Sequence, residues 1–327
     1  MDNHPISAHL LGLLFQLDGK QLQDQYRNHL SDFHDWDQKH HAEYWTVFPA
    51  NISERLSIDE TSFSNGELYT VVGSKASKGK KGTILASIKG TKAEDIIAVL
   101  ERIPLRLRNK VREVTMDMAP NMAKAIRRCF GNARRVIDRF HVQKLVYDAV
   151  QELRIRYRWE VLDEESKKIA SARKKGIPYD PELLSNGDTI KQLLARSRYL
   201  LFKHPSKWTE SQKHRAEILF VRFPLLKKAY DLAMALGDIF NKCKDKTVAF
   251  TKLGLWHNQV ENSGIASFES VARSIAAHHT DILHYFDNKS TNASAESFNA
   301  KLKAFRSIFR GVRDTKFFLY RVMKLYA

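Results

Sequence analysis

The sequence predicts an α/β protein in which a mixed sheet, with the element order β-β-β-α-β-α-β, is followed by a large all-helical insertion. Three observations support this prediction. Short β-prone segments begin at Leu56 and are separated by glycine and serine turns. Helix-like and strand-like patterns then alternate as far as Ile137. Residues 141–286 have a helical pattern almost throughout, and none of their runs resembles a strand.

The composition is that of a folded protein with a strongly basic surface. Of its 327 residues, 43% are hydrophobic, which allows two domains or one domain with a large insertion. The 54 lysines and arginines exceed the 37 acids and give a formal charge of +17, which favours a nucleic-acid partner. No run approaches about 18 apolar residues, so we expect no membrane span and a cytoplasmic protein. Cys129 and Cys243 lie far apart, and we expect buried free thiols.

A small helical region is expected at the N-terminus, over residues 1–52. Between residues 6 and 45 the hydrophobic residues recur at helical spacing, and Gly19 is expected to end the first helix. They are Leu10, Leu13, Leu14, Leu17, Tyr26, Leu30 and Phe33.

The first part of the core is expected over residues 53–143. Three β-prone runs predict consecutive antiparallel strands at residues 56–59, 68–72 and 83–88. A helix (93–103), a strand (113–117), a helix (121–130) and a strand (134–137) are predicted next. Ribonuclease H-like domains use this order of elements.

The helical insertion is expected over residues 144–286, ahead of a last helix in the core. Apolar residues such as Leu145, Val150 and Leu153 recur at helical spacing. Residues 167–186 are basic, contain Gly176, and are read as a helix end and a solvated loop. Residues 287–327 are expected to complete the core.

Two aspartates end apolar strands and are candidates for metal binding. Asp59 ends the first predicted strand and Asp117 ends the fourth. A carboxylate at such a place is costly unless it is paired, hydrated or bound to a cation. The alternative is that each aspartate caps a turn or a following helix.

Glu296 lies where a polar loop enters the last predicted helix. Further polar residues follow it on one helix face, at steps of three, four, three and four: Asn299, Lys303, Arg306 and Arg310. An acid followed by basic residues suits phosphodiester chemistry, because the lysine and arginine side chains could hold the phosphates of the DNA backbone. A capping glutamate with a solvated basic face is the alternative.

Three carboxylates would suit two Mg²⁺ ions, which Mn²⁺ could replace, during in-line displacement at phosphorus. Two other acids compete for the role. Glu60 points to the opposite face of the strand from Asp59, and Glu261 lies inside the predicted insertion.

Four segments of the chain, at residues 57–60, 115–118, 136–141 and 290–299, occur in a characteristic order. Together they resemble the successive blocks of DDE insertion-sequence transposases of the ISL-three group, over roughly residues 50–327. The resemblance implies a ribonuclease H-like core whose metal-binding acids are Asp59, Asp117 and Glu296. It also implies metal-dependent cleavage of DNA at transposon ends and strand transfer into target DNA.

The segment that begins at Asp138 resembles an Asp-x-x-His signature of transposases with such an insertion. By this resemblance Asp138 and His141 are accessory residues that help to hold the substrate or the core. The alternative is that His141 caps or packs at a strand-to-helix junction.

Fewer than sixty residues precede Asp59, and none is a cysteine, whereas relatives usually carry a zinc-binding and helix-turn-helix region there. We therefore expect the catalytic frame of a two-frame element, with a separate small protein that binds DNA. Double-stranded DNA and a second copy of the chain are the other expected partners. A nuclease or resolvase without strand transfer, and a non-catalytic DNA-binding protein, remain the alternatives.

Overall fold

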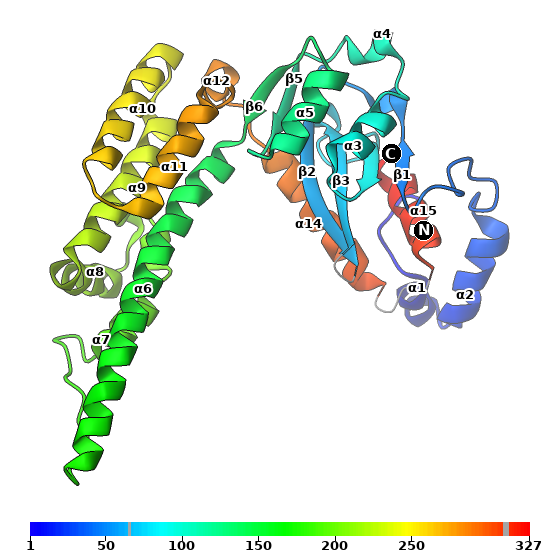
Figure 1. Cartoon of the computed structure of the whole chain (residues 1–327). Coiled ribbons are helices and arrows are strands. Elements are labelled where there is room, and N and C mark those ends of the chain that lie inside the picture. Colours follow the sequence, from blue (N-terminus) through cyan, green and yellow to red (C-terminus); the bar gives the residue numbers. More distant parts are fainter. Residues whose placement is uncertain (65–66, 310–313) are drawn as a thin grey trace. The chain divides into compact units, whose positions relative to one another are not determined.

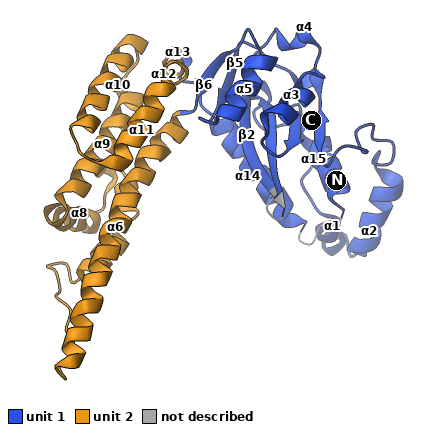
Figure 2. Ribbon diagram, viewed as in Figure 1, with its two compact units in different colours: residues 1–138, 288–327 blue, residues 139–287 orange. Residues whose placement is uncertain are grey.

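The computed structural model describes residues 1–64, 67–309 and 314–327. The chain forms two compact units (Figures 1 and 2). Met1–Asp138 and Asn288–Ala327 make up the first, here called the sheet unit, and Arg139–Asp287 make up the second, the helical unit. The last two helices in sequence therefore belong to the same unit as the strands.

A six-stranded sheet with the order β1-β4-β3-β2-β5-β6 is the centre of the sheet unit. β2, β3 and β4 pair antiparallel, while β5 and β6 run parallel to β2. Helices α3, α4 and α5 lie between β4 and β6 in sequence, so the predicted β-β-β-α-β-α-β order and the ribonuclease H-like α/β fold are confirmed. The bounds are β1 Trp45–Val47, β2 Arg55–Ser64, β3 Glu67–Ser74, β4 Ile84–Lys89, α3 Ala93–Leu100, α4 Leu105–Arg108, β5 Glu113–Met116, α5 Pro120–Cys129 and β6 Arg134–Ile137.

The N-terminal residues are only partly helical, and the prediction of helix as far as residue 45 is wrong. α1 (Ala8–Phe15), α2 (Gly19–Gln25) and a π-helical turn (Tyr26–Leu30) are followed by turns, and β1 then pairs antiparallel with β4. Thr46 is fully buried in β1, where its hydroxyl contacts the sulfur of Met323. Pairing with a strand about forty residues later determines this structure, and a local helical pattern contains no information about such pairing.

Two helices, α14 (Ala293–Ile308) and α15 (Thr315–Tyr326), cover one face of the sheet. Tyr69 and Val71 of β3 pack against Phe298 and Leu302 of α14 in one hydrophobic cluster, which α15 completes. Because side chains alternate across a strand, the residues between them point to the other face, where α3 and α5 pack (Figure 1). The hydrophobic core therefore lies on both sides of the sheet.

Helices alone form the helical unit, and no strand occurs in residues 139–287. Capping boxes begin α7 and α8, and Pro224 begins α9. α6 ends at Lys174, within the stretch 167–186 that was predicted to contain a helix end and a loop. The bounds are α6 Arg139–Lys174, α7 Ile190–Arg196, α8 Glu210–Arg222, α9 Pro224–Lys242, α10 Lys246–Glu261, α11 Ala266–Ala277, α12 His279–Leu283 and α13 Tyr285–Asn288.

Both cysteines are free thiols and are buried, as expected. Burial raises the pKa of Cys129 to about 11. Across the described residues, none of the helices combines the length and the apolar character that crossing a bilayer requires.

Leu302 tests the contribution of α14 to the sheet unit, because its side chain is fully buried among aromatic neighbours. We expect Leu302→Ala to lower the free energy of unfolding by about 2 to 5 kcal/mol, through lost burial and a residual cavity. Urea unfolding measures this change. Ile308→Ala, at an exposed position of the same helix, should cost much less, and equal losses would contradict the described packing.

Candidate active site

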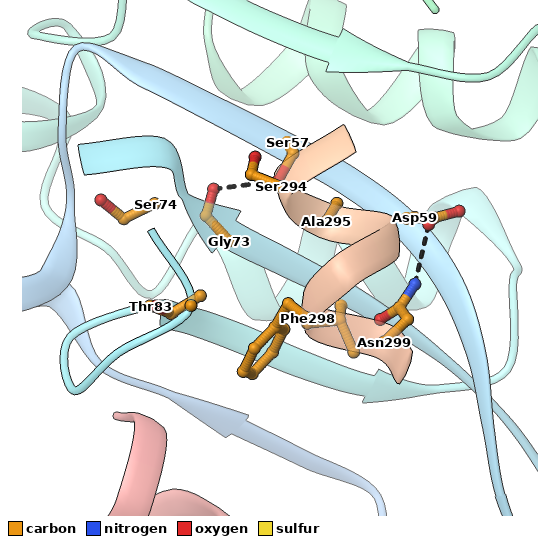
Figure 3. Close-up of a pocket in the computed structure, with 11 residues that line it drawn as sticks. Ser57, Asp59, Gly73, Ser74, Thr83, Ser294, Ala295, Phe298 and Asn299 are labelled. Atoms are coloured by element: carbon orange, nitrogen blue, oxygen red, sulfur yellow. Dashed lines mark hydrogen bonds between the residues drawn. The ribbon is translucent and has the colours of Figure 1, made fainter. Parts of the chain in front are cut away.

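Asp59 lies on the face of β2 that α14 covers. Its Oδ2 accepts a hydrogen bond from Asn299 Nδ2 at 2.7 Å, and Figure 3 shows the two side chains facing each other. Asp59 Oδ1 accepts from the backbone N–H of Glu60 at 2.9 Å. Two of the carboxylate's lone pairs are thus used, and its position relative to α14 is defined.

Asp117 directly follows β5, the strand that pairs in parallel with β2. Leu56 pairs with Val114 and Ser57 with Thr115, so the same register continued by two residues sets Asp59 opposite Asp117. Asp117 Oδ1 also accepts from the N–H of Ala119 at 2.8 Å, just before α5 begins. The aspartate therefore makes the turn contact that was the alternative interpretation, while the continued register would bring it opposite Asp59.

Glu296 is in the first turn of α14 and is half-buried. Asn292 and Asn299 lie on the same helix face, one turn before and one turn after it. The Asn292 amide reaches the backbone oxygen of Ile58 at 3.5 Å, and the Asn299 amide reaches Asp59. This places Glu296 on the stripe of α14 that faces β2.

The region around the two aspartates is electrostatically negative. Burial raises the pKa of Glu60, and the charges of Asp117 and Asp59 raise it further. By strand alternation Glu60 points away from the face that carries Asp59. The two aspartate charges thus contribute to the raised pKa of Glu60, after burial.

The oxygens of Asp59, in β2, and of Asp117, which follows β5, are hard donors, which suit Mg²⁺ or Mn²⁺. Asp59 and Asp117 therefore fit a divalent cation by their chemistry and their register. Among residues 1–64, 67–309 and 314–327, no group of three His, Cys, Asp or Glu side chains is placed closely enough to hold a metal ion. The role of Glu296 as the third ligand thus stays a prediction.

The basic face predicted on α14 divides into residues with different environments. Asn299, which was also expected to contact DNA, is 8% exposed and donates to Asp59, and its contact with DNA stays a prediction. Arg306 is half-buried, with its guanidinium 5.1 Å from the ring centre of Phe318. Lys303 is exposed, and Arg310 lies outside the described residues. Of the residues of this set that the structure describes, Lys303 is the exposed cation.

Asp138 follows β6 in the sheet unit, where it is 1% exposed and its N–H donates to the oxygen of Met116. His141 lies in the first turn of α6 and belongs to the helical unit. Glu261, one of the competing acids, is in α10 of the helical unit and lies 3.5 Å from His257. The accessory role of Asp138 and His141 stays a prediction.

Sequence reasoning missed a second polar group on the same face of β5. Glu113 and Thr115 alternate with apolar residues and are buried, and they contact Lys75 and Ser290. A charged residue at the start of a buried strand was the available signal.

Comparison with protein families gives one match. The DDE transposase model of the ISL-three group, described as a transposase, matches residues 56–322. Neither the curated proteins nor the solved structures contain a match.

The contact between Asn299 and Asp59 can be measured by a double-mutant cycle. We expect a coupling of about 1.5 to 3 kcal/mol between Asp59→Ala and Asn299→Ala, because hydrogen bonds to charged groups are among the stronger ones. Urea unfolding of the two single variants and the double variant gives the coupling. A cycle with Ser297→Ala, an exposed residue of the same helix, should give none, and strictly additive losses at Asn299 would contradict the contact.

Proposed function

The chain belongs to the ISL-three group of DDE transposases, and on that premise we propose that it cleaves DNA at transposon ends and joins the freed strands to target DNA. Membership of this family makes it a DNA-binding enzyme of transposition that depends on divalent metal. The observation that best supports the finer proposal is the parallel register of β2 and β5, which, continued by two residues, would bring Asp59 opposite Asp117.

The proposed reaction has two steps at phosphorus. Water first breaks the bond between phosphorus and the 3′ oxygen at the transposon end, leaving a 3′ hydroxyl. That hydroxyl then attacks a target phosphodiester and displaces the target strand's own 3′ oxygen. Two Mg²⁺ ions, when bound, would activate the attacking oxygen and stabilise the leaving one.

The residues of the chain have separate tasks in this proposal. Asp59, Asp117 and Glu296 would hold the metals. Asn299 orients Asp59 by occupying one carboxylate oxygen, so the other lone pairs point in a fixed direction. Lys303 would hold a DNA phosphate near the acids without reading sequence.

Further partners belong to the same proposal. A second copy of the chain would act on the other transposon end, and a separate small protein of the same element would supply end recognition. The activity is proposed for the cytoplasm. The net charge of +17 supports binding both to the transposon ends and to the target DNA.

The acid assignment predicts that Glu296→Gln and Asp117→Asn each reduce Mg²⁺-dependent strand cleavage at least about a hundredfold, since each removes an anionic metal ligand. Duplex binding should change little. Cleavage of a labelled end substrate and a binding titration measure the two effects.

Glu261→Gln is the matched control, because Glu261 is an exposed glutamate of the helical unit. Full activity in Glu296→Gln would overturn the assignment. Cleavage without joined products, in otherwise active protein, would favour a nuclease or resolvase instead.

Lys303→Gln should weaken binding to any duplex and reduce the slope of log affinity against log salt by about one unit, as expected for one lost phosphate contact. Binding titrations at several salt concentrations measure it. Lys124→Gln, at an exposed lysine of α5 on the other face of the sheet, provides the comparison. An unchanged slope in Lys303→Gln would show Lys303 to be ordinary solvated surface.

A further inference from the structure

The segment that leads into α14 is attached to the sheet at a series of polar contacts. Asn288 and Ser290 contact β5, Asn292 contacts β2, and Asn299 contacts Asp59. Between the first and last of these contacts lies Glu296. The contacts follow the sheet face in the same direction as the chain, so each one restricts the register of the next.

Glu113 is the centre of the first contact. One carboxylate oxygen accepts from Asn288 Nδ2 at 2.6 Å, and the other accepts from Ser290 Oγ at 2.5 Å. Glu113 is 6% exposed, so these bonds lie away from bulk water. Both oxygens are therefore committed to the segment before α14.

Lys75 completes the group from the end of β3. Its ammonium donates to Thr115 Oγ1 and to Ser290 Oγ, each at 2.6 Å, and it lies 3.9 Å from Glu113 Oε1. Ser290 thus accepts from Lys75 and donates to Glu113. Burial lowers the pKa of Lys75, while the charges of Glu113 and Asp138 act against that shift.

The backbone between the two anchoring residues is strained. Lys289 has a φ of 55°, in the left-handed region that costs a non-glycine residue about 1 kcal/mol or more. Asn288 Oδ1 accepts from the N–H of Ser290 at 3.1 Å and closes this turn. The contacts from Asn288 and Ser290 to Glu113 lie on both sides of this left-handed residue and help to offset its cost.

A buried ion pair is a poor source of stability, because desolvation offsets most of the attraction. What such a pair does well is to fix one arrangement among several. Glu113 and Thr115 lie on the same face of β5 as Asp117, which follows two residues after Thr115. The same strand therefore carries both a candidate metal ligand and the anchor for the helix that carries Glu296.

We propose that Glu113 and Lys75 are positioning residues, which set the register of α14 and so keep Glu296 on the helix face towards β2, the strand that carries Asp59. The inference rests on the proposed function only for the role of Glu296. The anchoring itself is a property of this chain's own contacts. It can be measured without the reaction.

The test uses full-length Glu113→Gln and Thr115→Val. In Glu113→Gln an amide NH₂ replaces one carboxylate oxygen, so a donor faces Asn288 or Ser290, which are themselves donors. In Thr115→Val the hydroxyl that accepts from Lys75 is lost, with little change in side-chain volume. Hydrogen–deuterium exchange at residues 294–299 should increase about tenfold, while β4 and α3 stay protected. The Mg²⁺ concentration for half-maximal cleavage should rise about 10 to 100-fold, with duplex affinity unchanged.

Thr115→Ser keeps the hydroxyl and should restore both readouts, whereas a purely structural effect of altered packing would not be restored. Glu94→Gln is the matched control, since it breaks an exposed ion pair with Lys124 in the same unit. Unchanged exchange at 294–299, or increased exchange throughout the sheet unit, would overturn the proposal. An active Glu296→Gln would refute the catalytic assignment, yet the exchange data would still decide whether Glu113 anchors α14.

Discussion

The packing of α14 on β2 is the contact on which the candidate site depends. It joins residues 240 positions apart in sequence, through the hydrogen bond between Asn299 and Asp59. Around that polar contact, Phe298 and Leu302 pack against Tyr69 and Val71. The apolar cluster supplies the stability and the polar contact fixes the rotation of the helix. Without this combination, an acid on α14 would have no defined place relative to the strands.

Much of the fold follows from local patterns. Short β-prone runs between glycine and serine turns predicted β2, β3 and β4, and helical spacing predicted α3 and α5, because each pattern is determined within a few residues. The same reasoning failed at β1, where leucines at helical spacing earlier in the region extended a helix prediction too far. Only pairing with β4 makes that segment a strand, and pairing depends on residues that are distant in sequence.

The site was predictable to the extent that it departs from the core pattern. Asp59 and Asp117 stand out because they end apolar strands, and the β2–β5 register, continued by two residues, would bring them opposite each other. Asn299 and Arg306 share a helix stripe with Lys303, but spacing does not say how deeply each lies. Depth depends on which neighbour covers the stripe, and here Asp59 covers one end while Phe318 covers another part.

Loop closure explains why anchoring before α14 matters. The sheet unit is made of two chain segments, with the whole helical unit between Asp138 and Asn288. The entropic cost of such an interruption grows slowly, by about 0.6 kcal/mol for each doubling of loop length, so a large insertion is tolerated. Closure alone, however, specifies no register for the returning chain. Contacts at the point of return, from Asn288 and Ser290 to Glu113, are therefore where register is determined, before the helix carrying Glu296 begins.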